Sequence, residues 1–328
     1  MFGKLTRRAA LCGGTASLIG AALPQHAHAG PPDFAGVTLR VGTYKGFDEV
    51  FLPLAGQAAT PYKIDYHEFN SGQLIVEAMN AGALDYGAWS EIPSVFAAAA
   101  QARVKIVAVL KGDVNDQVVL IPKTSSITDI AGLKGKRVGY VRGTTSHYYL
   151  LRMLWAAGLQ FSDIQAINLS PTDGAAAFRA GDLDAWAIYG YAIQFALAQG
   201  AARVLRTAQG ILSGNYHIAA SPEALADPKR RAAIADYLQR AGRGYNWLEA
   251  NKTAWSQALS PVIKVPLPFV EAQFEHESQP ERLVPVDDAA IASAQQVADT
   301  FVKAGLIAHP VDVKPYFDTR FAAAIAAV

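Results

Sequence analysis

The central stretch of the chain, residues 132–189, decides the fold and reads GLKGKRVGYVRGTTSHYYLLRMLWAAGLQFSDIQAINLSPTDGAAAFRAGDLDAWAIY. Short runs rich in β-branched and aromatic residues alternate there with longer runs whose apolar residues recur at helical spacing. The pattern predicts strands at 137–141, 165–169 and 184–188, and helices at 146–157 and 173–180. This alternation is typical of an α/β protein with largely parallel sheets.

The preceding part of the chain repeats the same order. It predicts strands at 37–42, 63–69, 86–88 and 105–110, and helices at 71–80 and 90–102. An acidic turn precedes the short third strand in each half, Ala83-Leu84-Asp85 in the first and Asp182-Leu183-Asp184 in the second. The repeat predicts two related α/β lobes. Asp182 and Asp184 are interpreted as structural, because alternate residues of a strand point to opposite faces.

Two extended segments, 118–121 and 217–220, bracket the second half and are predicted to be the crossings between the lobes. The predicted lobes are 33–117 together with 221–328, and 118–220. Residues beyond Pro222 are expected to be mainly helical, with 289–304 as the clearest amphipathic run. Two such lobes place a cleft at the carboxyl ends of their strands.

The first 29 residues have the features of an export signal. A basic start at residues 4–8 is followed by an apolar Gly/Ala-rich run at 9–23 and by a small-x-small cleavage site at 27–29. Thr6-Arg7-Arg8 resembles a twin-arginine start, and the apolar run is too short to span a bilayer as a stable helix. We therefore predict an exported, periplasmic protein.

The composition excludes several classes of protein. Hydrophobic residues make up 51% of the 328 residues and charged residues 17%, which excludes a disordered chain. Without residues 1–29, 26 Lys and Arg stand against 28 Asp and Glu, a net charge of −2 that gives no reason to expect a nucleic-acid partner. The single cysteine, Cys12, lies in the leader, so thiol chemistry is not expected in the exported protein.

Three loops at predicted strand ends have the chemistry of an anion site. They are Asn70-Ser71-Gly72, Trp89-Ser90-Glu91, and the run Gly143-Thr144-Thr145-Ser146-His147. Each opens a predicted helix, whose N-terminal N–H groups and dipole favour an anionic group. Tyr44 and Lys45 supply an aromatic ring and a cation at the same edge.

The alternative for each loop is an ordinary helix start. Hydroxyl N-caps are common and most bind nothing, so Ser90 is as well explained as a cap, and Lys45 as a solvated charge. Three consecutive hydroxyl residues after Gly143 exceed what capping requires. That run therefore favours a functional interpretation.

Other kinds of site find no support in the sequence. No metal-binding spacing of histidines, no nucleophile elbow, no phosphate-binding loop and no dinucleotide fingerprint is found. We expect neither a metal nor a cofactor, and no enzymatic activity.

Residues 132–189 closely resemble the central block of the aliphatic-sulfonate-binding proteins, the periplasmic receptors of sulfonate ABC importers. Further matches to this family are Tyr44-Lys45-Gly46, the helix at 77–85, and the stretch 295–307 with Val311-Asp312-Val313. The resemblance covers nearly the whole chain beyond the leader.

The resemblance implies a type II periplasmic binding protein: two doubly wound α/β lobes with a hinge and a central ligand cleft. It implies that a monomer captures a small organic anion, a sulfonate, and delivers it to an ABC permease and ATPase in the inner membrane. The family's ligand contacts fall on loops that match Lys45, Ser71-Gly72, Ser90-Glu91, residues 143–147 and the stretch around Tyr189. Charge-assisted hydrogen bonds of about 1.5–3 kcal/mol each can supply most of the ~8 kcal/mol of a micromolar affinity.

The chain also departs from the family pattern on the expected ligand side. Trp89-Ser90-Glu91 replaces the usual Thr-Gly-Asp, and Tyr189-Gly190-Tyr191 replaces Trp-Asp-Pro. The first helix, at 47–59, is shortened. Trp89, Tyr189 and Tyr191 can stack on a planar group or simply fill the cleft walls, and Glu91 can pair with an amine or favour its helix N-terminus.

Besides a signalling or sensor module, two further functions stay open on this evidence. One is a receptor for a thiamine-type pyrimidine precursor or a nitrate-like anion. The other is an enzyme of the desulfinase branch, which resembles these receptors but uses a cysteine nucleophile that residues 30–328 do not contain.

Overall fold

The computed structural model describes residues 33–328. The predicted leader at 1–29, with its twin-arginine-like start and Cys12, lies outside the described residues. Within the described part, no helix is long and apolar enough to cross a membrane.

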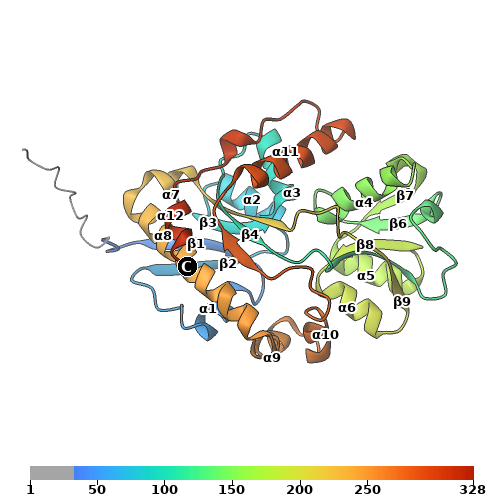
Figure 1. The fold of residues 1–328 in the computed structure, drawn as a ribbon, viewed down its shortest axis with the longest axis horizontal. Coiled ribbons are helices and arrows are strands. Elements are labelled where there is room, and N and C mark those ends of the chain that lie inside the picture. Colours follow the sequence, from blue (N-terminus) through green and yellow to red (C-terminus); the bar gives the residue numbers. More distant parts are fainter. Residues whose placement is uncertain (1–32) are drawn as a thin grey trace, which may run out of the picture. The chain divides into compact units, whose positions relative to one another are not determined.

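The strands form two mixed sheets (Figure 1). The first sheet has the order β11-β4-β10-β3-β1-β2 and the second the order β7-β6-β8-β5-β9. In each, three adjacent strands are parallel, and the next strand, β10 in the first sheet and β5 in the second, runs antiparallel to both of its neighbours. The strands are β1 Thr38–Thr43, β2 Lys63–Glu68, β3 Tyr86–Ser90, β4 Lys105–Lys111, β5 Gln117–Pro122, β6 Arg137–Tyr140, β7 Gln165–Asn168, β8 Ala185–Tyr189, β9 Ala202–Thr207, β10 Asn215–Ala220 and β11 Arg282–Val284.

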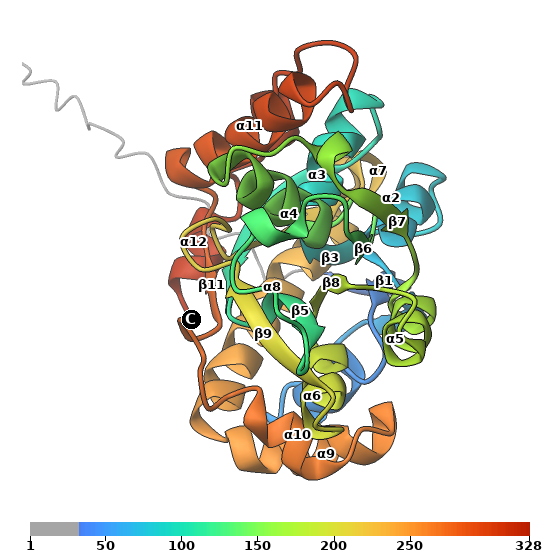
Figure 2. The ribbon, with the colours of Figure 1, turned by 90° about the vertical axis from the view of Figure 1, so that its right-hand side faces the viewer.

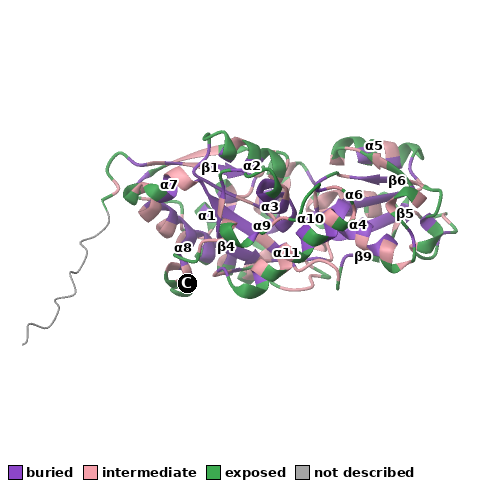
Figure 3. Cartoon of the chain, turned by 90° about the horizontal axis from the view of Figure 1, so that it is seen from above, coloured by how far each residue is buried: buried purple, intermediate pink, exposed green. Residues whose placement is uncertain are grey.

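Helices cover both faces of both sheets, so that the central strands are buried between helices with exposed outer faces (Figure 3). The helices are α1 Asp48–Leu54, α2 Gly72–Asn80, α3 Glu91–Ala99, α4 Thr145–Ala156, α5 Pro171–Ala180, α6 Tyr191–Ala198, α7 Pro222–Ala226, α8 Pro228–Ala250, α9 Lys252–Ile263, α10 Leu267–Ala272, α11 Asp288–Lys303 and α12 Ala322–Ala326.

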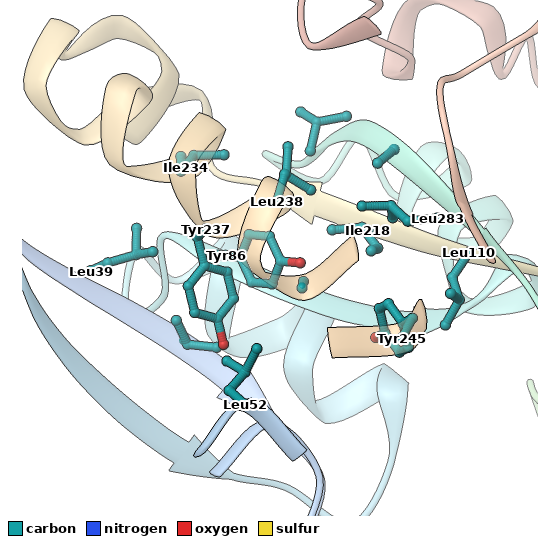
Figure 4. Close-up of a cluster of buried hydrophobic side chains, with 14 of the residues drawn as sticks. Leu39, Leu52, Tyr86, Leu110, Ile218, Ile234, Tyr237, Leu238, Tyr245 and Leu283 are labelled. Atoms are coloured by element: carbon teal, nitrogen blue, oxygen red, sulfur yellow. The ribbon is translucent and has the colours of Figure 1, made fainter. Parts of the chain in front are cut away.

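The larger apolar core lies between the first sheet and helices α1, α7, α8, α9 and α12. Alternate residues of β1 and β3 face this core, and α8 contributes Tyr237 and Leu238 to it (Figure 4). The rings of Tyr86 and Tyr237 meet edge to face with centroids 4.9 Å apart, and the Tyr237 hydroxyl donates to Asp48 Oδ2 at 2.8 Å. This hydrogen bond satisfies polar atoms that would otherwise be costly to bury.

The second sheet has a core on each face. Helix α4 lies on one face of the sheet, and α5 and α6 lie on the other (Figure 2). Trp186 of β8 belongs to the apolar core beneath α5 and α6. Helix α11 packs against both α3 and α4, so it contacts a helix of each sheet.

The two acidic turns of the sequence make matching contacts. Asp85 accepts hydrogen bonds from the backbone and guanidinium of Arg40 on β1, and Asp184 accepts the same set from Arg137 on β6. Each arginine also donates to the carbonyl of the glycine three residues before its aspartate. The structural interpretation of Asp184 is therefore confirmed.

Three expectations about the fold need correction. The sheets are mixed, because β5 and β10 run antiparallel to their neighbours. The segments at 118–121 and 217–220 are not crossings but lie within β5 and β10, at the interior of a sheet. The chain passes between the sheets at 112–116 and 208–214, which connect β4 to β5 and β9 to β10. Helix α6 and strand β9, between residues 191 and 207, were also missed.

Candidate functional site

A cavity of about 280 Å³ is lined by loops of both sheets, and we call it the cleft cavity. The first sheet contributes the ends of β1, β2 and β3 together with β10, and the second contributes the start of β5, the start of α4 and the end of β8. The lining residues are Tyr44, Asn70, Ser71, Gly72, Ser90, Pro93, Asp116, Gln117, Thr144, Thr145, Tyr189, Gly190 and Tyr216. Among them there is no Lys or Arg side chain.

Three helices begin at the cleft cavity. Ser71, Ser90 and Thr144 are the N-cap residues of α2, α3 and α4. The Ser71 hydroxyl accepts from Leu74 N at 3.4 Å, whereas no side-chain capping bond is found at α3 or α4 in the described chain. The first turns of these helices therefore present N–H groups and the positive ends of their dipoles to the cavity.

The loop before α4 is shaped by its own hydroxyl groups. Thr144 Oγ1 donates to the carbonyl of Val141 at 2.8 Å, and Ser146 Oγ accepts from Val141 N at 3.0 Å. Gly143 has φ of +73°, a left-handed conformation in which other residues are strained. The side chains of Thr144 and Ser146 are thus turned back onto the loop instead of capping α4.

The close approach of α2 to β3 depends on Gly72. A Cβ atom at this position would lie 2.5 Å from Trp89 Cβ and 2.9 Å from the Tyr44 hydroxyl. Both are closer than real Cβ contacts allow, so another residue at 72 would push the start of α2 away from Tyr44 and the cavity wall.

A short polar chain crosses the cavity wall from one sheet to the other. Thr145 Oγ1 donates to Gln117 Oε1 at 2.6 Å. Gln117 Nε2 lies 3.5 Å from the hydroxyl of Tyr216 on β10. Gln117 therefore holds the start of α4 against the passage at 112–116 and against the first sheet.

The tyrosines of the cavity keep their protons at neutral pH. Burial raises the pKa of Tyr189 to about 12, and burial also raises the pKa of Tyr44 and Tyr216. The three hydroxyls are therefore neutral donors as well as acceptors.

Seven of the thirteen predicted site residues line the cleft cavity: Tyr44, Ser71, Gly72, Ser90, Thr144, Thr145 and Tyr189. Lys45 is exposed and does not line it. Tyr191 lines a different and larger cavity of about 680 Å³, together with Phe178, Trp186 and Phe195.

Trp89 and Glu91 are buried away from the cavity. The Trp89 indole packs with Ile75 and Met79 in the core beneath α2, and its Nε1 donates to Ser94 Oγ at 2.7 Å. Glu91 accepts from the hydroxyls of Ser213 at 2.6 Å and Ser293 at 2.8 Å. Burial raises the pKa of Glu91, and these hydroxyl groups partly offset the shift. Glu91 thus connects α3 to the second passage between the sheets and to α11.

Ser146 and His147 also face the interior. Ser146 is fully buried in its loop, and the His147 ring packs against Tyr140, Phe161 and Phe301. Burial, assisted by the charge of Arg142, lowers the pKa of His147 to about 4, so this ring is neutral at physiological pH. Neither side chain lines the cavity.

Three polar lining residues outside the quoted loops were not predicted: Asp116, Gln117 and Tyr216. They lie at the end of the passage 112–116, at the start of β5 and on β10, next to the segments predicted to be crossings. A polar Asp-Gln pair directly before an apolar strand was the available signal. Within residues 33–328, no group of three or more His, Cys, Asp or Glu is placed to hold a metal ion.

Comparison with known proteins gives the family. A family model described as NMT1/THI5 like matches residues 63–250. A protein of Escherichia coli K12 named as aliphatic sulfonates-binding is 34% identical over 281 residues, covering 84% of this chain and 87% of that protein.

Solved structures agree with this match. The periplasmic aliphatic sulphonate binding protein SsuA from Escherichia coli has a TM-score of 0.77 at 32% identity, over 84% of this chain and 90% of that chain. The alkanesulfonate-binding protein SsuA from Xanthomonas axonopodis pv. citri, bound to MOPS, has a TM-score of 0.78 at 30% identity, over 86% and 98%.

A more distant likeness shows the fold alone. The desulfurization enzyme DszB has a TM-score of 0.63 at 16% identity, over 88% of this chain and 99% of that chain. The two SsuA proteins share far more of the sequence. The chain therefore belongs to the NMT1/THI5-like family and has the fold of the periplasmic binding proteins.

Proposed function

We propose that the protein is the periplasmic solute-binding component of an ABC importer and that it captures a small organic sulfonate in the cleft cavity. The observation that carries the proposal is the convergence of the N-termini of α2, α3 and α4 on one cavity that no described Lys or Arg lines. Both SsuA relatives are named for binding sulfonates.

The chemistry of the lining suits an anion that stays ionised. A sulfonate remains deprotonated near neutral pH, so it needs donors and no general acid or base. Helix N–H groups and neutral hydroxyls supply such donors without a fixed positive charge. At about 280 Å³ the cavity lies just below the usual range for ligand pockets, which begins at about 300 Å³, and this supports a compact ligand.

We further propose that the two sheets belong to two lobes that close on the ligand by hinge motion. Residues 112–116 and 208–214 would form the hinge. The lobe boundaries would then lie in these two passages instead of at 117/118 and 220/221, where the sequence predicted them. The contacts of Gln117 with Thr145 and of Glu91 with Ser213 lie at or beside them. Hinge closure is a common way for binding proteins to enclose a ligand.

The proposed ligand contacts are the seven predicted residues that line the cavity, joined by Gln117 and Tyr216. The partners would be a permease and an ATPase of the inner membrane, with the protein acting as a monomer in the periplasm. The periplasmic location is supported by the description of the Escherichia coli relative and by the leader-like residues 1–29.

Calorimetric titration of residues 30–328 tests the proposal. The panel contains taurine, alkyl and aryl sulfonates, sulfate, nitrate and a thiamine-type pyrimidine. We expect at least one organic sulfonate to bind with micromolar affinity. If no sulfonate binds below millimolar concentration while another class does, the sulfonate assignment is wrong and the receptor assignment stands.

The pyrimidine alternative has one observation in its favour, the tyrosines Tyr44, Tyr189 and Tyr216 in the cavity wall. An aromatic ligand could stack there, and the same titration decides between the two. We propose no enzymatic activity, since the desulfinase reaction needs a cysteine that residues 33–328 lack. Turnover of an aryl sulfinate by the protein would contradict this.

A further inference from the structure

The cleft cavity contains one group that does not suit an anion. Asp116 is the acidic residue among its described lining residues, and no cationic side chain accompanies it. A simple anion receptor gains nothing from a carboxylate in its wall, because like charges repel and desolvation strengthens the repulsion. The presence of Asp116 therefore needs a separate explanation.

The backbone of Asp116 is held in place, and its carboxylate interacts with Gln117, but one carboxylate oxygen is left without a partner. Its N–H donates to Asp113 Oδ2 at 3.1 Å, and its carbonyl accepts from Gly190 N at 2.8 Å. Oδ1 is buried and has no hydrogen-bond partner among the residues that the structure describes. A buried polar atom without a partner is uncommon and marks a place where a ligand group can bind.

The surroundings of Asp116 are negative as well. A small cavity of about 30 Å³ adjoins the cleft cavity through Asp116 and Tyr216, and Asp113, Glu277 and Glu281 line it. Burial raises the pKa of Asp116 to about 7, with the Asp113 carboxylate adding to the shift. When the Asp116 carboxylate is ionised, no cationic side chain of the described chain stabilises its charge.

We propose that Asp116 makes the cleft cavity selective for sulfonates that also carry a cationic amine. The helix N-termini and hydroxyls would hold the sulfonate, and Asp116 Oδ1 would accept a hydrogen bond from the ammonium group. The proposal rests on the sulfonate-binding function and narrows its ligand class to zwitterions.

A matched pair of ligands isolates the effect of the amine. Taurine and 1-propanesulfonate have the same number of heavy atoms and differ in an ammonium against a methyl group. A site built for a polar group discriminates strongly against an analogue that lacks it, because its own polar atom is left unpaired. We expect taurine to bind at least about tenfold more tightly, a difference of about 1.4 kcal/mol.

Calorimetry with the wild-type protein and two variants tests the proposal. Asp116→Asn keeps the shape of the side chain and removes its charge, and we expect it to abolish the preference for taurine while 1-propanesulfonate binds as well as before or better. Glu281→Gln, a nearby acid outside the cleft cavity, is the control and should keep the preference. Circular dichroism and thermal unfolding establish that each variant is folded, and Asp116→Ser replaces the first variant if it is not.

The outcomes separate the two claims. Equal affinities of the wild-type protein for both sulfonates would overturn the role of Asp116 and leave the sulfonate-binding function intact. An undiminished preference in folded Asp116→Asn would overturn it as well. If neither sulfonate binds, the role of Asp116 is overturned, and the titration with the full panel of sulfonates decides the sulfonate-binding function separately.

Discussion

The two sheets share a strand order but differ in how their matching aspartates are covered. The orders β2-β1-β3-β10-β4 and β7-β6-β8-β5-β9 correspond strand by strand, and Asp85 and Asp184 hold the equivalent arginines, Arg40 and Arg137. Asp85 is fully buried, whereas the Asp184 side chain is 32% exposed. The same local motif is thus placed in two different environments.

The difference comes from the tail of the chain. Helix α8 returns to the first sheet and brings Arg230, whose Nη1 lies 3.1 Å from Asp85 Oδ1. In the second sheet, no second arginine within the described residues reaches Asp184. Local sequence therefore sets the contact, and tertiary packing sets its contribution to stability.

The largest expected effect is that of removing the buried charge. Asp85→Asn leaves Arg40 and Arg230 without their carboxylate. We expect it to lower the free energy of unfolding by about 3 kcal/mol. This is the lower end of the range for a broken buried ion pair, because both arginines are partly exposed. Urea unfolding followed by circular dichroism measures it. A loss below about 1 kcal/mol, as for an exposed ion pair, would mean that burial does not increase the contribution of Asp85 to stability.

Removing the second arginine should cost less. Arg230→Met keeps the apolar stem and deletes the bond to Asp85, with an expected loss of about 1.5 kcal/mol. In the Asp85→Asn background the same change should cost less than in the wild-type protein, since the partner is already absent. Strictly additive losses in this double-mutant cycle would show that Arg230 does not act through Asp85.

The second sheet provides the matched counterpart. Asp184→Asn breaks an ion pair whose side chains are 32% and 40% exposed, so we expect a loss below about 1 kcal/mol. The same urea series measures it. If Asp184→Asn lowered the free energy of unfolding as much as Asp85→Asn, the difference in burial of the two aspartates would not determine their contributions to stability.

The pH dependence of stability should also differ between two acids near the first sheet, Asp85 and Glu281. Burial raises the pKa of Asp85, but Arg40 and Arg230 more than offset this and hold the pKa below its usual value. Its contribution is therefore present above about pH 4 and is lost as the pH falls below that value.

Glu281 should act in the opposite direction. Burial raises its pKa to about 8, with Glu249 and Glu277 adding to the shift. The folded state favours the protonated form, so its contribution is present below about pH 4 and is lost as the pH rises towards 8. Thermal unfolding between pH 5.5 and 8.5 should show falling stability that Glu281→Gln flattens. An unchanged slope in that variant would show that Glu281 does not titrate in this range.

Much of the fold follows from the sequence. The strands and helices of the central block were predicted to within about two residues, because each has a clear apolar period and a turn or cap at its ends. Strands β5 and β10 were identified as extended, but their place inside the sheets was missed. Strand order depends on pairing between distant residues, which local pattern does not report.

The candidate site was predicted less completely. Loops that open helices, such as those at Ser71 and Thr144, were found because capping chemistry is local. Trp89 and Glu91 were predicted to face the ligand, but both side chains point into the interior. The sequence next to a residue does not show which distant helices pack over its side chain. Asp116 was missed because it reaches the cavity only through the passage between the sheets.

The central claim is that an organic sulfonate binds at the N-termini of α2, α3 and α4. A crystal structure of the protein with the tightest-binding sulfonate of the calorimetric panel tests it most directly. We predict sulfonate oxygens within hydrogen-bonding distance of the first-turn N–H groups of α2 and α4, with Thr145 and Gln117 at the wall. A sulfonate bound instead in the larger apolar cavity beside Phe178 and Phe195 would contradict the account.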